Sequence, residues 1–207
     1  MRASHKAAGI AAAAALAVGG IACQVAAADT PVTVRVNHFE ADCAVTWAKD
    51  GVSLRPTIPG TGPSSYALTD GEGTVTFDLG SLNNPVALAN SINARGTFHG
   101  GFLLVDRAGH FVEAVDGEGT LPTGEPALYV RTDADPVARP TPVVTYAEVP
   151  LLVPTVSPLD PFELTVRVPQ AKFDITPEFA KVLNDTFGTG SAQPGTPWAT
   201  CSGSITT

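Results

Sequence analysis

Short stretches in which apolar and polar residues alternate run through most of this chain. The clearest of them are 32–36, 74–79 and 164–168, where valine, leucine or phenylalanine takes every second position. Successive side chains of a β-strand point to opposite faces, so a period of two predicts strands that each bury one face. Further strands are predicted at 44–47, 127–131 and 143–149.

The most apolar strand candidate is the central stretch 96–106, which also contains His99. Gly100 and Gly101 interrupt its pattern, and adjacent glycines inside a strand indicate a β-bulge or the close approach of another group to the backbone. A turn at 106–109 then leads into a second strand. Glycine- and proline-rich segments are predicted to form loops, at 55–63 and 117–126.

One segment near the C-terminus has the signals of an α-helix. Thr176 suits the N-cap, Pro177 suits the first helical position and Gly188 suits the end. Residues 84–91 fit either a short helical turn or a loop. The predicted fold class is therefore mainly β, an antiparallel β-sandwich or open barrel with one short C-terminal α-helix. One face of this helix is apolar, with Phe179, Val182, Leu183 and Phe187.

The N-terminus has the features of a secretory signal peptide. Arg2 and Lys6 precede an uncharged run of small and apolar residues that ends in an A-x-A cleavage signal. We expect 1–28 to be removed and 29–207 to form one β-rich domain of a secreted or cell-envelope protein. The alternatives are a lipid attached at Cys23 and a transmembrane anchor, for which the apolar run is short.

Charge and cysteine content narrow the classes of partner. Loss of Arg2 and Lys6 leaves 10 basic residues against the 20 acidic ones, a net charge of −10. That balance argues against nucleic acid and anionic membrane surfaces as partners. The two remaining cysteines, Cys43 and Cys201, predict a disulfide in an exported protein, with two free thiols as the alternative. The sequence has no C-x-x-C pair, so we expect no metal site.

Motifs for catalysis are missing from the sequence. It contains no G-x-S-x-G, H-E-x-x-H, P-loop or G-x-G-x-x-G pattern. His99 and His110 lie on adjacent predicted strands, but a metal would need a third ligand that the pattern does not offer. The tyrosines Tyr66, Tyr129 and Tyr146 are interpreted as strand residues with one polar tip. We therefore expect a protein that is not an enzyme.

Four motifs in the second half follow one another in a distinctive order. F-H-G-G-F-L at 98–103 is followed by A-L-Y-V at 127–130, T-Y-A-E-V-P-L at 145–151 and F-D-I-T-P-E-F-A at 173–180. In form and order they resemble the HtaA-type haem-transport domain of actinobacterial secreted and surface proteins. The resemblance covers roughly 74–190. The high content of alanine, glycine and proline is also similar to that of exported actinobacterial proteins.

This resemblance implies a non-enzymatic binding domain for haem or another flat apolar ligand. His99 matches the family histidine that is expected to support the haem ligand. The N-terminal tyrosine that is expected to bind the iron has no counterpart, because residues 29–59 include Trp47 but no tyrosine, and Tyr66 is the nearest one. The candidate ligand-binding residues are Tyr66, Phe98, His99, Gly100, Gly101, Phe102 and Leu103.

Two other functions remain open at this point. An envelope structural or protein-interaction module needs no small-molecule pocket and exposes an apolar or edge-strand surface. A secreted hydrolase, the third choice, needs convergent carboxylates in a cleft.

Overall fold

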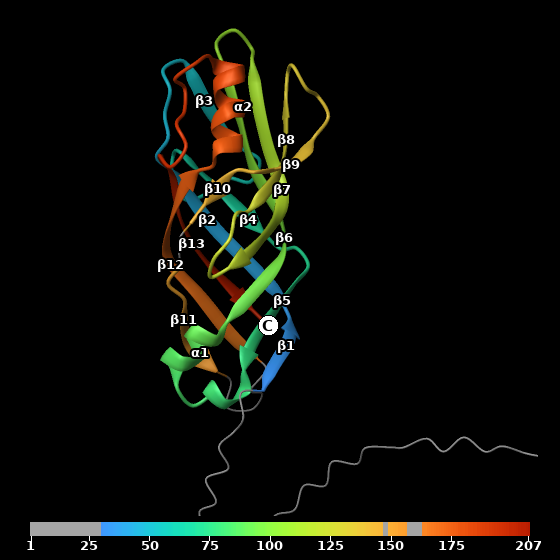
Figure 1. Ribbon diagram of the computed structural model, residues 1–207, viewed down its shortest axis with the longest axis vertical. Coiled ribbons are helices and arrows are strands. Elements are labelled where there is room, and N and C mark those ends of the chain that lie inside the picture. The colour runs from blue at the N-terminus through green and yellow to red at the C-terminus, as the bar shows by residue number, and fades with distance from the viewer. Residues whose placement is uncertain (1–29, 147–148, 157–162) are drawn as a thin grey trace, which may run out of the picture.

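The computed structural model describes residues 30–146, 149–156 and 163–207 of the chain. These residues form a mainly β structure, a 13-stranded antiparallel sheet that is nearly closed as an elongated barrel (Figure 1). The predicted fold class is therefore confirmed. Helices α1 and α2 lie near opposite ends of the long axis. The elements are β1 Pro31–Arg35, β2 His38–Val45, β3 Val52–Pro56, β4 Ser65–Thr69, β5 Gly73–Asp78, the 3₁₀-helix Leu79–Ser81, α1 Pro85–Ser91, β6 Asn93–Asp106, β7 Phe111–Leu121, β8 Ala127–Thr132, β9 Arg139–Pro142, β10 Val144–Thr145, β11 Leu152–Val156, β12 Leu164–Ile175, α2 Pro177–Phe187 and β13 Pro197–Thr206.

The long strand β6 connects more of the sheet than any other described strand. One of its edges pairs with β7 along nearly its whole length. Its other edge pairs in succession with β5, β4 and β3. The register with β7 shifts between Phe98 and Gly101, which confirms the predicted bulge.

Glycine is required at the bulge for two reasons. Gly100 and Gly101 have φ values of 104° and 142°, which L-residues with a side chain rarely adopt. A Cβ atom at Gly100 would also lie 2.5 Å from the carbonyl oxygen of Ala67, and one at Gly101 would lie 2.2 Å from that of Ala114. The close approach that the sequence indicated is thus made by neighbouring strands.

One segment of chain joins the two ends of the sheet and so nearly closes the barrel. β9 pairs with β8, and the chain then passes through Val143 into β10, which pairs with β12. Val143 itself makes backbone hydrogen bonds to two other segments. Its N–H donates to Pro126 O at 3.1 Å, and its carbonyl accepts from Thr176 N at 3.3 Å. The strand order is β10-β12-β13-β2-β4-β6-β7-β8-β9.

Two hydrophobic cores fill the two ends of the barrel. The α2-end core is built around Phe102, Phe179 and Trp198, and the rings of Phe102 and Trp198 lie 4.9 Å apart. The α1-end core includes Val75, Phe77 and Leu88, with Leu88 supplied by α1 itself. Each helix therefore covers one end of the barrel with its apolar face.

The helices follow the expected local rules. Thr176 caps α2 by accepting a hydrogen bond from Phe179 N at 3.1 Å, and Gly188 ends it with φ 93°. The segment at 84–91 is a helix, because the Asn84 side chain accepts from the backbone N–H groups of Val86 and Ala87.

Several strand boundaries differ from the sequence prediction. The strand expected at 44–47 is the end of β2, which begins at His38 and stops at Val45. β7 continues through residues 117–121, which were expected to be a turn-rich connection, because pairing with β6 outweighs their low strand propensity. The strand expected at 143–149 is represented by Val144–Thr145 alone within the described residues. The predicted signal peptide lies outside the described residues. No helix in the described ranges is long and apolar enough to cross a membrane.

The predicted disulfide is present and joins neighbouring strands. Cys43 in β2 pairs directly with Cys201 in β13, and their sulfur atoms are bonded across 158 residues of sequence. Both cysteines are buried. The bond therefore closes a very long loop inside the barrel wall, the case in which the chain-entropy contribution is largest.

We predict that the double substitution Cys43→Ala and Cys201→Ala lowers the free energy of unfolding by about 2–5 kcal/mol, because the unfolded chain regains the entropy of a long open loop. Equilibrium urea denaturation measures the change. A reducing agent should bring the native protein to the stability of the variant and leave the variant unaffected. Equal stability of the variant and the oxidised native protein would contradict the prediction.

Candidate functional site

The seven residues proposed from the sequence do not form one site. Side chains along β6 alternate, so Phe98 and Phe102 are buried inside the barrel whereas the side chain of His99 is 65% exposed on the outside. Leu103 is only partly buried, next to the fully buried Leu104. A ligand held by Phe98 inside the barrel could not reach the imidazole of His99 without crossing the sheet.

Tyr66 and Phe102 belong to the α2-end core. Their ring centroids lie 5.1 Å apart, and the Tyr66 hydroxyl accepts a hydrogen bond from the indole N–H of Trp198 at 3.4 Å. Burial raises the pKa of the Tyr66 phenol to about 12. This tyrosine is therefore neutral at physiological pH, and ionising it would be costly.

A cavity of about 140 Å³ lies between the two cores. Its wall includes Phe98 and Leu128 from the α2-end core, Ala94 and Ile205 from the α1-end core, and the disulfide. Several wall positions carry very small residues. These small wall residues are Ala41, Gly73, Ala94, Gly96, Gly119 and Gly203. At Gly73, Gly96 and Gly203 a Cβ atom would lie less than 3.0 Å from a backbone oxygen of a neighbouring segment, so glycine is needed there for close approach of the backbones.

The cavity wall offers no charge to its interior. Glu72 and Arg95 are the charged residues among the described wall residues, and both are exposed to solvent. Tyr146 also contributes to the wall, but its hydroxyl donates to the carbonyl of Thr120, and burial raises the pKa of its phenol to about 12. The remaining wall is dominated by apolar side chains, so a molecule held there would be surrounded by hydrocarbon and aromatic rings.

Haem binding stays a prediction. His99 lies on the outer face of β6, so its imidazole does not reach the cavity. Tyr66 contributes to the cavity wall, but burial raises the pKa of its phenol, which disfavours the tyrosinate that would bind an iron atom.

Outside the barrel, each described histidine contacts an aspartate through Nδ1. His38 lies 2.8 Å from Asp70, His99 lies 3.5 Å from Asp116 and His110 lies 2.8 Å from Asp133. Asp116 also accepts a hydrogen bond from Gly100 N at 3.0 Å, so it ties the bulge of β6 to β7. All six side chains are at least one-third exposed.

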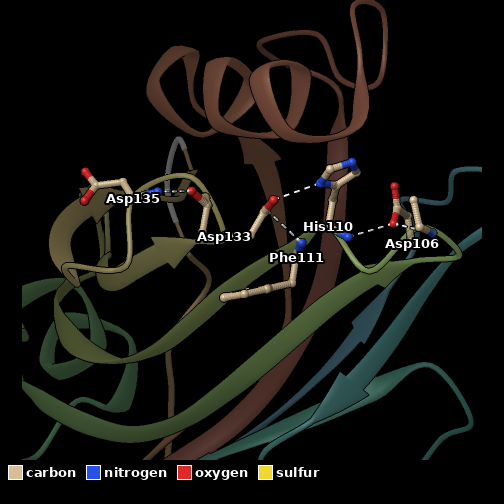
Figure 2. Close-up of polar contacts among 7 residues, drawn as sticks. Asp106, His110, Phe111, Asp133 and Asp135 are labelled. Carbon is tan, nitrogen blue, oxygen red and sulfur yellow. Dashed lines mark hydrogen bonds and ion pairs between the residues drawn. The ribbon is translucent and has the colours of Figure 1, made fainter.

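The pair His110 and Asp133 joins the β6–β7 turn to the chain after β8 (Figure 2). Asp133 accepts from Phe111 N at 3.2 Å through its second oxygen, and Asp106 accepts from His110 N at 2.9 Å. The hydrogen bond that the His110 imidazole donates to Asp133, followed by the charges of Asp133 and Asp106, raises the pKa of His110. The same hydrogen bond, with that from Phe111, lowers the pKa of Asp133.

The contacts described for this pair hold two loops together. The hydrogen bonds described for His110 and Asp133 involve no hydroxyl or thiol that the imidazole could activate. Across the described ranges there is also no group of three or more histidine, cysteine or acidic side chains that could hold a metal ion. We therefore interpret the pair as a clasp between loops.

The sequence did not predict the cavity, because the small residues that contribute to its wall are spread over several strands. Ala94, Gly96 and Phe98 occupy alternate positions of β6, and Gly119 lies opposite Gly96 on β7. Alternating small residues in two neighbouring strands are visible in the sequence. They indicate a cavity only when the pairing of the strands is known, because only then do the small residues share one face.

Comparison with known proteins adds no family. A scan against protein-family models found no match, and a search of the curated proteins found none either. The HtaA-type resemblance therefore stays a prediction that rests on the order of its four motifs.

We predict that Asp133→Asn lowers the pKa of His110 toward the ordinary value of 6.5, because it removes the carboxylate that stabilises the imidazolium. NMR titration of the three imidazoles measures this. Asp116→Asn is the matched control and should leave His110 unchanged. An unaltered His110 titration in Asp133→Asn would rule out the clasp as the cause of the shift.

The pH dependence of stability follows from the same pair. Because the pKa of His110 is raised in the folded protein, the stabilisation that its imidazolium gives the folded state is fully present below pH 6.5. This stabilisation is lost as the pH rises through the folded-state pKa. Because the pKa of Asp133 is lowered in the folded protein, the stabilisation that its carboxylate gives the folded state is fully present above pH 3.8. This stabilisation is lost as the pH falls through the folded-state pKa. The clasp should therefore contribute most between these two values.

Proposed function

We propose that this protein is an exported, non-enzymatic binding domain that holds a small uncharged apolar molecule inside its barrel. The observation that carries the proposal is the apolar cavity between the two cores. The cavity is partly open to solvent, so a guest can enter it, and its wall is dominated by apolar side chains. Its volume of about 140 Å³ suits a small guest molecule.

The surroundings of the cavity support a preformed site. Its wall is made of hydrogen-bonded strands, and the disulfide between Cys43 and Cys201 fixes two of them. A rigid wall reduces the entropy lost on binding, because little has to be ordered when the guest arrives. The disulfide is also compatible with an oxidising compartment outside the cytoplasm, which supports export.

A second candidate is an interaction module of the cell envelope. It is favoured by large apolar side chains that are exposed on elements around α1: Val86 on α1 is 70% exposed, and Leu79 and Leu152 are exposed on the neighbouring 3₁₀-helix and β11. Exposed apolar side chains mark interaction surfaces when they form a contiguous patch, whereas single scattered ones are normal. The cavity is nevertheless the more specific feature, so ligand binding is the function we put first.

Binding of xenon and cyclohexane to the purified protein tests the proposal. We expect both to shift the methyl NMR signals of the wall residues Leu128, Val144 and Ile205. The exposed methyl groups of Val86 and Val137 serve as internal controls and should not move. A native protein whose wall methyl groups respond to neither guest would exclude ligand binding in the cavity.

A substitution that fills the cavity provides the matching variant. A Cβ atom at Gly119 would lie 3.5 Å from Pro126 and 3.7 Å from Phe98, which is ordinary contact, so a side chain can be attached at this wall position without a clash of its Cβ. We predict that Gly119→Val abolishes the response to both guests and raises the free energy of unfolding by about 1 kcal/mol, as cavity-filling changes commonly do. Glu118→Val, at the exposed neighbouring position of β7, is the control and should bind normally.

A further inference from the structure

We infer that the cavity selects a single uncharged aromatic ring, such as a benzene-type ring, over a saturated hydrocarbon of the same size and over a phenol. This inference rests on the proposed function and names the chemical class of its ligand. It follows from three properties of the wall: its aromatic content, its volume and the engagement of its hydroxyl groups.

Five aromatic side chains contribute to the wall among the described residues. Phe39 and Phe98 form one pair, with ring centroids 6.4 Å apart and planes inclined by 42°. Tyr146 and Phe173 form a second pair, 5.0 Å apart and nearly perpendicular at 81°. Aromatic rings prefer offset or edge-to-face contacts because their faces are negative and their edges positive. A flat aromatic guest can make such contacts with the rings of this wall, whereas a saturated ring has no such charge pattern.

The volume of the cavity suits one small ring. An engineered apolar cavity of roughly 150 Å³ in another protein stays dry and binds benzene. The cavity here, at about 140 Å³, is close to that size. One six-membered ring therefore matches the cavity in size.

The two tyrosine hydroxyls of the wall each make a hydrogen bond within the protein. The Tyr146 hydroxyl donates to Thr120 O, and the Tyr66 hydroxyl accepts from Trp198. A hydroxyl on the guest gives up hydrogen bonds with water when it enters this largely apolar wall, and that loss costs free energy. Phenol should therefore bind more weakly than benzene although it differs by one oxygen atom.

A comparison of three six-membered rings tests the inference. Methyl NMR titrations of the native protein with benzene, cyclohexane and phenol give three dissociation constants. We expect benzene to bind at least tenfold more tightly than either of the others. Hydrophobic transfer alone would favour cyclohexane, which is the less water-soluble of the two hydrocarbons, so a preference for benzene isolates the contribution of the aromatic wall.

Two variants identify the source of the preference. Phe98→Leu keeps an apolar side chain but removes a ring, and it should reduce the ratio between benzene and cyclohexane toward one. Phe111→Leu removes a ring outside the described wall and should leave that ratio unchanged. Native-like amide spectra of both variants establish that they are folded.

The outcomes separate the two proposals. If cyclohexane and xenon bind but benzene binds no more tightly, the preference for an aromatic ring is overturned and the binding function stands. If phenol binds as tightly as benzene, the exclusion of hydroxyl groups is overturned. If none of the guests shifts the wall methyl groups, the cavity is not a binding site and both proposals fail.

Discussion

The hydrogen bonding of β6 to four other strands is the constraint on which the rest of this structure depends. A strand of this length can pair with β5, β4 and β3 in turn along one edge because the bulge at Gly100 and Gly101 bends it between them. Without the bulge, Phe98 and Phe102 would still share a face, but the strand would run straight past β4 and the barrel could not curve. This strand supplies Ala94 and Phe98 to the cavity, Phe102 and Leu104 to the α2-end core, and His99 to one of the outer histidine pairs.

Local rules were sufficient to predict much of the fold. The central strand, its bulge, the capped helix α2 and the disulfide each have a signal within a few residues or in the cysteine count. The end of β7 was not predictable in this way, because residues 117–121 are strand only through their pairing with β6. Propensity describes what a segment prefers alone, and pairing in a sheet routinely overrides it.

The candidate site shows the same difference between features that local sequence predicts and features that depend on strand pairing. Phe98 and His99 are adjacent in a strand, and the period of two that predicts the strand also places them on opposite faces. Grouping them as one ligand site contradicted the pattern itself. The cavity needed information that no local pattern holds, since its wall brings together Ala41, Ala94, Gly119 and Gly203 from four different strands. A sequence shows where small residues are, and the register of the sheet shows which of them face each other.

The place of β13 in the sheet has a consequence for the order in which the protein can fold. This strand, the last one described, lies between β12 and β2, and it carries Cys201 to its partner in β2 (Figure 1). Until residues 197–206 have been synthesised, β2 and β12 lack the strand that joins them, and the disulfide cannot form. A chain that emerges from its N-terminus, during synthesis or transport, would therefore be unable to complete this sheet until residues 197–206 had emerged.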